Sequence, residues 1–286
     1  MRDLRSSATR ATRWLRALAW MLVMGLLVTS AACGGGEEAP ATEEDAAATG
    51  EEAAAPAADL EPGNAAVAGM GSGSATIAGS VTYTGQVPTL QPIRMDADPQ
   101  CAAKHTGPVY GQILELGDGQ TMAHVFVKVT NPPAGDYPAP SQPAVIDQEG
   151  CTYHPHVMGV LEGQDLVFLN SDELLHNVHG LPKQNREFNL GMPATRTQAS
   201  VELNTPEPLF PVKCDVHPWM QAYVAVMEHP FFAVTDLDGA FEIAGLPAGE
   251  YQVEAWHEKL GTRTGTVTVA DGETGSVDFQ FDVPQS

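Results

Sequence analysis

Three metal-binding side chains occur in the stretch CDVHPWM, residues 214–220. Cys214, His217 and Met220 supply a thiolate, an imidazole and a thioether, each three residues from the next. Soft sulfur ligands combined with imidazole favour copper over magnesium or calcium. Two imidazoles and one thiolate with a weak axial thioether are the ligands of a blue-copper electron-transfer site. The stretch contains only one imidazole, so a second histidine must come from another part of the chain.

A candidate for this second histidine lies upstream, in the stretch NSDELLHNVH at residues 170–179. The His-Asn-Val-His segment, followed downstream by Cys-x-x-His-Pro-aromatic-Met, resembles the small type 1 copper proteins, the cupredoxins, and among them the amicyanin type. The resemblance implies that copper is the cofactor. It also implies four metal ligands: His176, Cys214, His217 and Met220.

The resemblance also suggests which residues support the ligands. We expect the Asn177 amide to form a hydrogen bond with the cysteine loop, and we expect Pro218 and Trp219 to stiffen and shield that loop. His179 corresponds to a histidine that does not bind the metal in amicyanin-like proteins. A second, harder metal site built from His154, His156 and His179 remains an alternative to ordinary hydrogen-bonded histidines.

The folded part of the chain is predicted to be all-β. Short alternating runs such as residues 76–83 and 124–129 end at Gly and Pro turn signals, a pattern typical of β-sandwiches. Residues 144–229 resemble a whole cupredoxin domain, which is a Greek-key β-sandwich. Residues 230–286 resemble the closing part of a carboxypeptidase regulatory-like, transthyretin-like β-sandwich.

Residues 75–143 are predicted to form the first part of that same transthyretin-like sandwich, so the cupredoxin domain would be an insertion. Neither flanking segment alone offers enough strands for a core, because an isolated strand pair is marginal. Three tandem units are the alternative.

The first 74 residues are predicted to lie outside these domains. Five arginines precede an apolar run at residues 17–28, which indicates a signal peptide at residues 1–32. Cys33 follows small residues and precedes three glycines, which resembles a bacterial lipoprotein junction, although ordinary cleavage stays open. Residues 33–74, rich in Ala, Glu, Gly and Pro, are predicted to be a disordered linker.

Two of the four cysteines remain once Cys33 is assigned to the lipid and Cys214 to the metal. In an oxidising compartment Cys101 and Cys151 are expected to form a disulfide, and two unpaired buried thiols are the alternative. The signal peptide and the lipoprotein-like junction at Cys33 predict that the protein is exported, to the periplasm or the cell surface, and held to a membrane by its N-terminal lipid.

The charge narrows the possible partners. Lys and Arg total 14 against 36 Asp and Glu, for a net charge of −22, which argues against nucleic acid and favours a basic partner. We expect a carrier of single electrons between exported redox proteins, not an enzyme, with His217 at an exposed end as the electron route. The alternatives are copper storage or delivery, or a structural adhesion module with a vestigial site.

Overall fold

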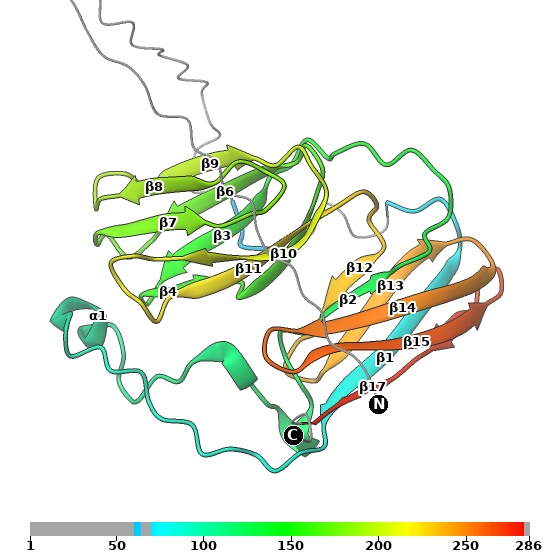
Figure 1. The fold of residues 1–286 in the computed structure, drawn as a ribbon, viewed down its shortest axis with the longest axis horizontal. Helices are drawn as coiled ribbons and strands as arrows, with labels where there is room; N and C mark the ends of the chain where they lie inside the picture. Colours follow the sequence, from blue (N-terminus) through cyan, green and yellow to red (C-terminus); the bar gives the residue numbers. More distant parts are fainter. Residues whose placement is uncertain (1–59, 64–69, 283–286) are drawn as a thin grey trace, which may run out of the picture. The chain divides into compact units, whose positions relative to one another are not determined.

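The computed structural model describes residues 60–63 and 70–282 (Figure 1). Nearly all regular structure in these residues is β-strand, which confirms the all-β fold class. The predicted signal peptide at residues 1–32 and the lipidated Cys33 lie outside the described residues. In the described part of the chain, no helix has both the length and the apolar character needed to cross a membrane.

Nine strands in the middle of the described chain form a first sandwich, which we call the central sandwich. One sheet has the order β5-β11-β10-β7-β8 and the other has the order β4-β3-β6-β9. The strands are β3 (Ala144–Glu149), β4 (Thr152–His154), β5 (Val157–Leu161), β6 (Asp165–Asn170), β7 (His176–Gly180), β8 (Phe188–Met192), β9 (Gln198–Glu202), β10 (Glu207–Lys213) and β11 (Gln221–Met227). Strands β5 and β11 pair in parallel, and so do β3 and β6, while the other neighbours are antiparallel.

The core of the central sandwich explains why these strands form. Alternate residues of β10 point inward, so that Phe210 and Val212 are buried between exposed or half-buried neighbours. Period-two alternation of this kind fits a strand with one face on a core. Strands β5 and β6 are buried on both faces and read as continuous apolar runs.

Strands from both ends of the described chain form the second sandwich, which we call the flanking sandwich. One sheet contains β13-β1-β16, with β17 also paired to β1, and the other has the order β12-β2-β14-β15. The strands are β1 (Ala75–Tyr83), β2 (Phe126–Val129), β12 (Phe232–Val234), β13 (Ala240–Leu246), β14 (Gly249–His257), β15 (Gly261–Val269), β16 (Thr274–Ser276) and β17 (Phe279–Phe281).

The segment between β1 and β2, all of it described, contains the short helices α1 (Pro99–Ala103), η3 (Gln112–Leu114) and η4 (Asp118–Gln120). Asp98 caps α1, and Pro99 occupies its first turn, where a missing N–H costs nothing. Part of this segment packs on the central sandwich, because Met95 and Cys101 belong to its buried core. Residues 75–143, predicted to be only the first part of the flanking sandwich, therefore contact both sandwiches.

The segment at residues 33–74, predicted to be a disordered linker, packs on the folded chain where the structure describes it. Gly63 exchanges two backbone hydrogen bonds with Val145, and Gly73 donates one to the carbonyl of Gly245. Leu60 and Met70 pack against buried apolar clusters. These two large apolar side chains interrupt the Ala-Glu-Pro composition and give the segment surface to bury, so the prediction of disorder is wrong for these residues.

Candidate metal centre

The two ligand segments predicted from sequence meet at one end of the central sandwich. His176 begins β7, while Cys214 and His217 lie in the loop between β10 and β11. One ligand atom from each of the three side chains lies within 4.8 Å of the others, and all three residues are buried. The Nδ1 atoms of the two histidines are 2.9 Å apart, and His217 Nδ1 is 3.8 Å from Cys214 Sγ.

The fourth predicted ligand, Met220, closes the same loop. Its backbone N–H donates to the carbonyl of His217 at 2.9 Å, and its carbonyl accepts from the N–H of Cys214 at 3.2 Å. Met220 is buried in the core that also contains Cys214. Pro218 follows His217 and stiffens this turn, because the proline ring fixes the backbone angle φ.

A buried carboxylate holds the outer nitrogen of His176. Nε2 of His176 donates to Asp172 Oδ2 at 2.9 Å, and Asp172 also accepts from the N–H groups of Gly150 and Cys151. Lys104 Nζ lies 3.0 Å from Asp172 Oδ1. Burial by itself raises the pKa of Asp172, but these partners outweigh it and lower the pKa to about 2. Asp172 is therefore an anion that fixes the ring of His176.

The centre favours both a thiolate and a positive charge beside it. Burial raises the pKa of the Cys214 thiol, but hydrogen bonds from His176 and from backbone N–H groups outweigh it and lower this pKa. Burial lowers the pKa of His176, yet Asp172 and Cys214 raise it to about 9. The lowered pKa makes the Cys214 proton easier to lose, and the anionic Asp172 lies on the other side of His176, so the site favours positive charge at this position.

These residues fit a copper ion. Atoms that each bind a metal at about 2.0–2.3 Å lie roughly 3–4 Å from one another. His217 Nδ1 lies at such distances from His176 Nδ1 and Cys214 Sγ, and all three ligand atoms lie within 4.8 Å of one another. Because Nε2 of His176 is hydrogen-bonded to a carboxylate, Nδ1 is the ring nitrogen left to face the shared position, and it would hold a metal there after losing its proton. Two imidazoles and one cysteine sulfur lie together here, and the same loop carries the Met220 thioether, which are the donor types of a copper site.

Three residues were predicted to support the ligands, and the structure gives each a different role: Asn177, Pro218 and Trp219. The expected hydrogen bond across the two loops is present, because the N–H of Asp215 donates to Asn177 Oδ1. The Trp219 ring lies 5.1 Å from that of His217 and donates from Nε1 to the carbonyl of Cys151. Pro218 is exposed, so it stiffens the loop but does not shield the centre.

The three histidines considered for a second metal site, His154, His156 and His179, do not form a cluster. His179 contacts Asp215 and Glu187, and His156 contacts Glu258 and the carbonyl of Gln221. Nε2 of His154 lies 2.6 Å from the hydroxyl of Thr152. Among the described residues, no cluster of potential ligand atoms contains any of these three histidines.

His217 is not at an exposed end of the site, so the prediction of an exposed electron route through it is wrong. The residue is 2% exposed. Its Nε2 lies 3.1 Å from Asp98 Oδ2 and 3.5 Å from Cys101 Sγ. Both of these residues come from the α1 segment, more than 100 positions earlier in the chain. No local pattern in the sequence indicates that this segment folds over the histidine.

Cys101 and Cys151 form a disulfide with a Cα–Cα distance of 5.6 Å, so the alternative of two free thiols does not describe this structure. Two carboxylates beside the histidines were not predicted. Asp172 lies four residues before His176, a spacing that sequence inspection can find. Asp98 directly precedes Pro99, and an Asp-Pro pair is a helix-start signal, but its contact with His217 has no local signature.

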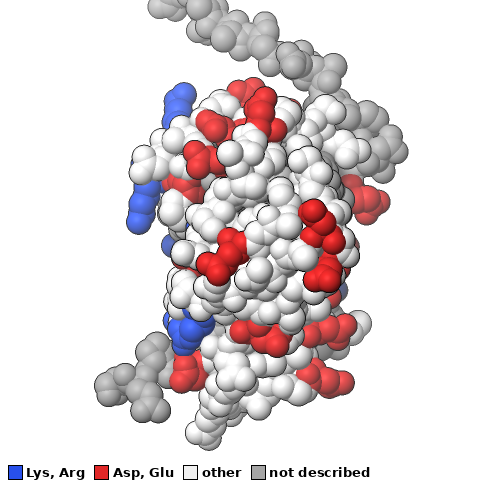
Figure 2. Space-filling model, turned by 90° about the vertical axis from the view of Figure 1, so that its right-hand side faces the viewer, with Lys and Arg blue, Asp and Glu red and all other residues white. Residues whose placement is uncertain are grey.

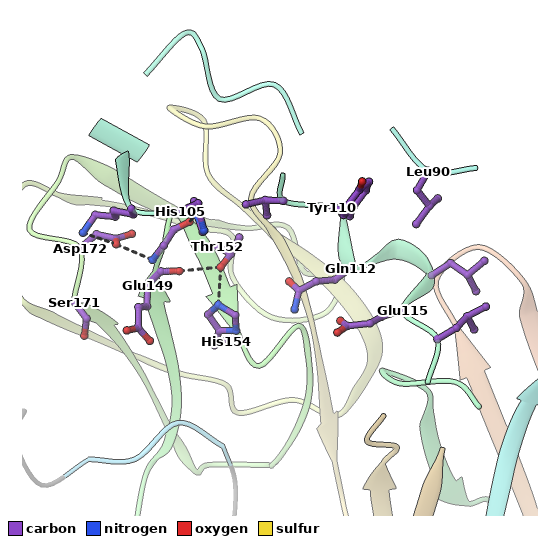
Figure 3. A pocket seen from close by; sticks show the side chains of 16 residues that line it. Leu90, His105, Tyr110, Gln112, Glu115, Glu149, Thr152, His154, Ser171 and Asp172 are labelled. Atoms are coloured by element: carbon purple, nitrogen blue, oxygen red, sulfur yellow. Dashed lines mark hydrogen bonds and ion pairs between the residues drawn. The ribbon is translucent and has the colours of Figure 1, made fainter. Parts of the chain in front are cut away.

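A cavity of about 850 Å³ adjoins this carboxylate network (Figure 3). Asp172 and Lys104 line one part of it, with His105, His154, Tyr110 and Glu115 elsewhere on its wall. One hydrogen bond thus separates the cavity wall from His176.

Comparison with known proteins gives two partial likenesses. Residues 217–282, less than half of the chain, match the carboxypeptidase regulatory-like domain family. No curated protein matches the chain.

Among solved structures, a copper-containing nitrite reductase from Thermus scotoductus SA-01 is similar, with 19% identity and a TM-score of 0.28 over 34% of this chain. The chain spans 25% of that reductase. A variant of amicyanin in its Cu(I) form has 19% identity and a TM-score of 0.27, covering 35% of this chain and 98% of amicyanin. A purple cupredoxin from Nitrosopumilus maritimus has 19% identity and a TM-score of 0.25 over 29% of this chain and 99% of its own.

Proposed function

We propose that this chain is a type 1 copper protein that carries single electrons between redox partners outside the cytoplasm. The proposal rests on one observation. Ligand atoms of the buried residues His176, Cys214 and His217 all lie within 4.8 Å of one another. Bound copper would supply one-electron chemistry by alternating between Cu(I) and Cu(II). We propose a carrier and not an enzyme, because a copper oxidase needs a second centre that binds oxygen.

The residues around the centre suit a carrier because they restrict movement. Asn177 ties the two ligand loops together, and the turn from Cys214 to Met220 is closed by its own backbone hydrogen bonds. Ligands that are held by such contacts rearrange little when the charge of the metal changes. This lowers the energy that each electron transfer must spend on reorganisation.

We propose that electrons pass on the His176 side of the centre. Asp172 links His176 to the wall of the cavity in Figure 3. The exposed apolar side chains of Leu175 and Val216 directly neighbour the ligand histidines in sequence, and they give a partner apolar surface to contact.

The partner is proposed to carry a basic docking face. The chain has a net charge of −22, and Figure 2 shows acidic side chains spread over the face in view. Opposite charges speed the encounter of two proteins, and salt screens this attraction. The N-terminal sequence supports export and attachment to a membrane through a lipid on Cys33, and the acidic charge disfavours nucleic acid as a partner.

Copper loading tests the metal site. We expect the purified wild-type protein to bind one Cu(II) and to show an intense visible absorption band. The Cys214→Ser protein should lose the band because a serine oxygen cannot form the copper–thiolate bond. His179→Ala is the matched control: this histidine is three residues from His176 but contacts Asp215 and Glu187, so the band should persist. A Cys214→Ser protein that stays intensely coloured would refute the assignment.

Copper storage or delivery is a second candidate, and the burial of both ligand histidines favours it. Exchange of electrons is fastest where a ligand edge reaches the surface, whereas a covered site retains its metal. Voltammetry of the copper-loaded protein separates the two functions. A carrier shows a reversible one-electron couple, whereas a storage protein loses copper when it is cycled.

A further inference from the structure

A carboxylate from outside the central sandwich covers the outer edge of His217. Asp98 Oδ2 lies 3.1 Å from His217 Nε2, on the ring edge opposite the Nδ1 atom that faces His176. The imidazole is 3% exposed, while the Asp98 side chain is 32% exposed. Asp98 therefore stands between the histidine and solvent.

The backbone of α1 fixes the orientation of this carboxylate. Asp98 Oδ1 accepts from the N–H of Gln100 at 2.9 Å and from that of Cys101 at 3.4 Å. With one oxygen held by the helix cap, the other is directed at His217 without free rotation of the side chain. Forming the hydrogen bond to the histidine therefore costs little additional side-chain conformational entropy.

The α1 segment is itself attached to the central sandwich at two points. Cys101 is bonded to Cys151, and Lys104 pairs with Asp172 at 3.0 Å. Cys151 also donates its N–H to Asp172, the carboxylate that holds His176. One disulfide therefore connects the two carboxylates that hold the two ligand histidines, and it lies against His217, whose Nε2 is 3.5 Å from Cys101 Sγ.

We infer that Asp98 is a positioning residue of the metal centre, which fixes the tautomer of His217 and closes its outer edge. A carboxylate only accepts hydrogen bonds, so His217 carries its proton on Nε2, and the Nδ1 lone pair is free to face the metal. A carboxylate on the far nitrogen also makes the imidazole a stronger donor to the metal. This role of Asp98 deepens the proposed function, because the copper-affinity measurement below assumes that the site binds copper.

The test is Asp98→Asn. Asparagine has nearly the same shape as aspartate and is a good helix N-cap, so α1 should be retained. Its NH₂ group can turn toward Nε2 and then requires a lone pair there, which moves the histidine proton to Nδ1. In the protein without added metal, nitrogen-15 NMR should place the His217 proton on Nε2 in wild type and shift it toward Nδ1 in the variant. Copper affinity, measured by competition with a chelator, should fall about 10–100-fold.

Asp96→Asn is the matched control. Asp96 is two residues away and exposed, and its carboxylate pairs with Arg94 at the surface. It should leave both the tautomer and the affinity unchanged. Asp98→Ser, which keeps a cap but is too short to reach the ring, should lower the affinity as Asp98→Asn does.

The outcomes separate the two proposals. If wild type binds copper but Asp98→Asn changes neither the tautomer nor the affinity beyond about threefold, the role of Asp98 is refuted and the copper site stands. If wild type binds no copper, the proposed function fails. In that case the NMR measurement still decides whether Asp98 fixes the ring of His217.

Discussion

At the scale of single residues, buried histidines have pKa values shifted in opposite directions, depending on the partners of each ring. Burial alone lowers the pKa of His176, but its carboxylate and thiolate partners raise this pKa to about 9. His229 and His257 have lost water without gaining a hydrogen-bonded anion, and burial lowers the pKa of each to about 4. Nδ1 of His257 accepts from the N–H groups of Lys259 and Leu260, which requires that nitrogen to be unprotonated.

This predicts an acid-sensitive flanking sandwich. The ordinary pKa of histidine is near 6.5, so between pH 6.5 and 4 the unfolded chain binds protons that folded His257 does not. The stabilisation is complete above pH 6.5 and is lost as the pH falls toward 4, by up to about 3 kcal/mol for this residue. His257→Asn keeps an acceptor but does not titrate.

We therefore expect the free energy of unfolding to fall less between pH 7 and 4.5 in His257→Asn than in wild type, by about 2–3 kcal/mol. Urea denaturation at the two pH values measures it. Equal losses in both proteins would show that His257 does not carry this dependence.

At this scale the sequence predicted that His176, Cys214 and His217 come together and that Asn177 contacts the cysteine loop, but it did not predict the contact that covers His217. Cys214, His217 and Met220 lie in one loop, and loop spacing is visible in a sequence. The contact of Asp98 with His217 joins positions 119 apart, and only the path of the intervening chain creates it. The exposure of His217 depends on that contact and was therefore predicted wrongly.

At the scale of elements, β1 is the most constrained strand of the flanking sandwich. It pairs with β13, β16 and β17. A Cβ atom on Gly79 would overlap the carbonyl oxygen of Val277 and would lie 2.8 Å from the ring of Phe241. Paired strands on both sides leave this strand no room to move away.

Gly79→Ala is therefore expected to destabilise the protein by about 1–3 kcal/mol, since overpacking forces backbone shifts. Gly249→Ala in the same sandwich is the control, because its Cβ would make only ordinary contacts at 3.5 Å with Tyr251. Thermal and urea unfolding of both variants measure the difference. Equal stability of the two variants would contradict the close packing at Gly79.

Strands were predictable where alternation is regular. The expected run at residues 76–83 is β1, and the run at 124–129 contains β2. The helix α1 was not predicted, because five residues are too few to show a helical period. Its start signal, Asp98-Pro99, is local and was available in the sequence.

At the scale of the whole molecule, the chain leaves the flanking sandwich and returns to it. Strand β1 pairs with β13, and β2 pairs with both β12 and β14, although the central sandwich lies between them in sequence. This is the pairing that the insertion hypothesis requires, and we propose on this basis that residues 144–229 are inserted into a transthyretin-like domain. Tandem units would not share sheets in this way.

The two sandwiches meet through a buried ion pair. Nε2 of His156 lies 2.7 Å from Glu258 Oε1, and both side chains are 6% exposed. Nδ1 of His156 faces the carbonyl of Gln221 at 2.9 Å, so both ring nitrogens of this buried histidine face acceptors. The hydroxyl of Tyr223 donates to the other oxygen of Glu258.

Removing one partner of this pair should weaken the whole molecule. Glu258→Gln removes the charge of the buried carboxylate that His156 and Tyr223 both contact, and we expect a loss of about 3–5 kcal/mol. The double variant His156→Gln/Glu258→Gln removes both partners, and its free energy of unfolding should fall clearly less than the sum of the losses in the two single variants. A coupling energy above about 1 kcal/mol in this cycle, from urea denaturation, would identify the pair as a joint between the sandwiches. Additive effects within about 0.5 kcal/mol would mean that the apolar contacts of Phe126, Phe232 and Trp256 hold the sandwiches together without it.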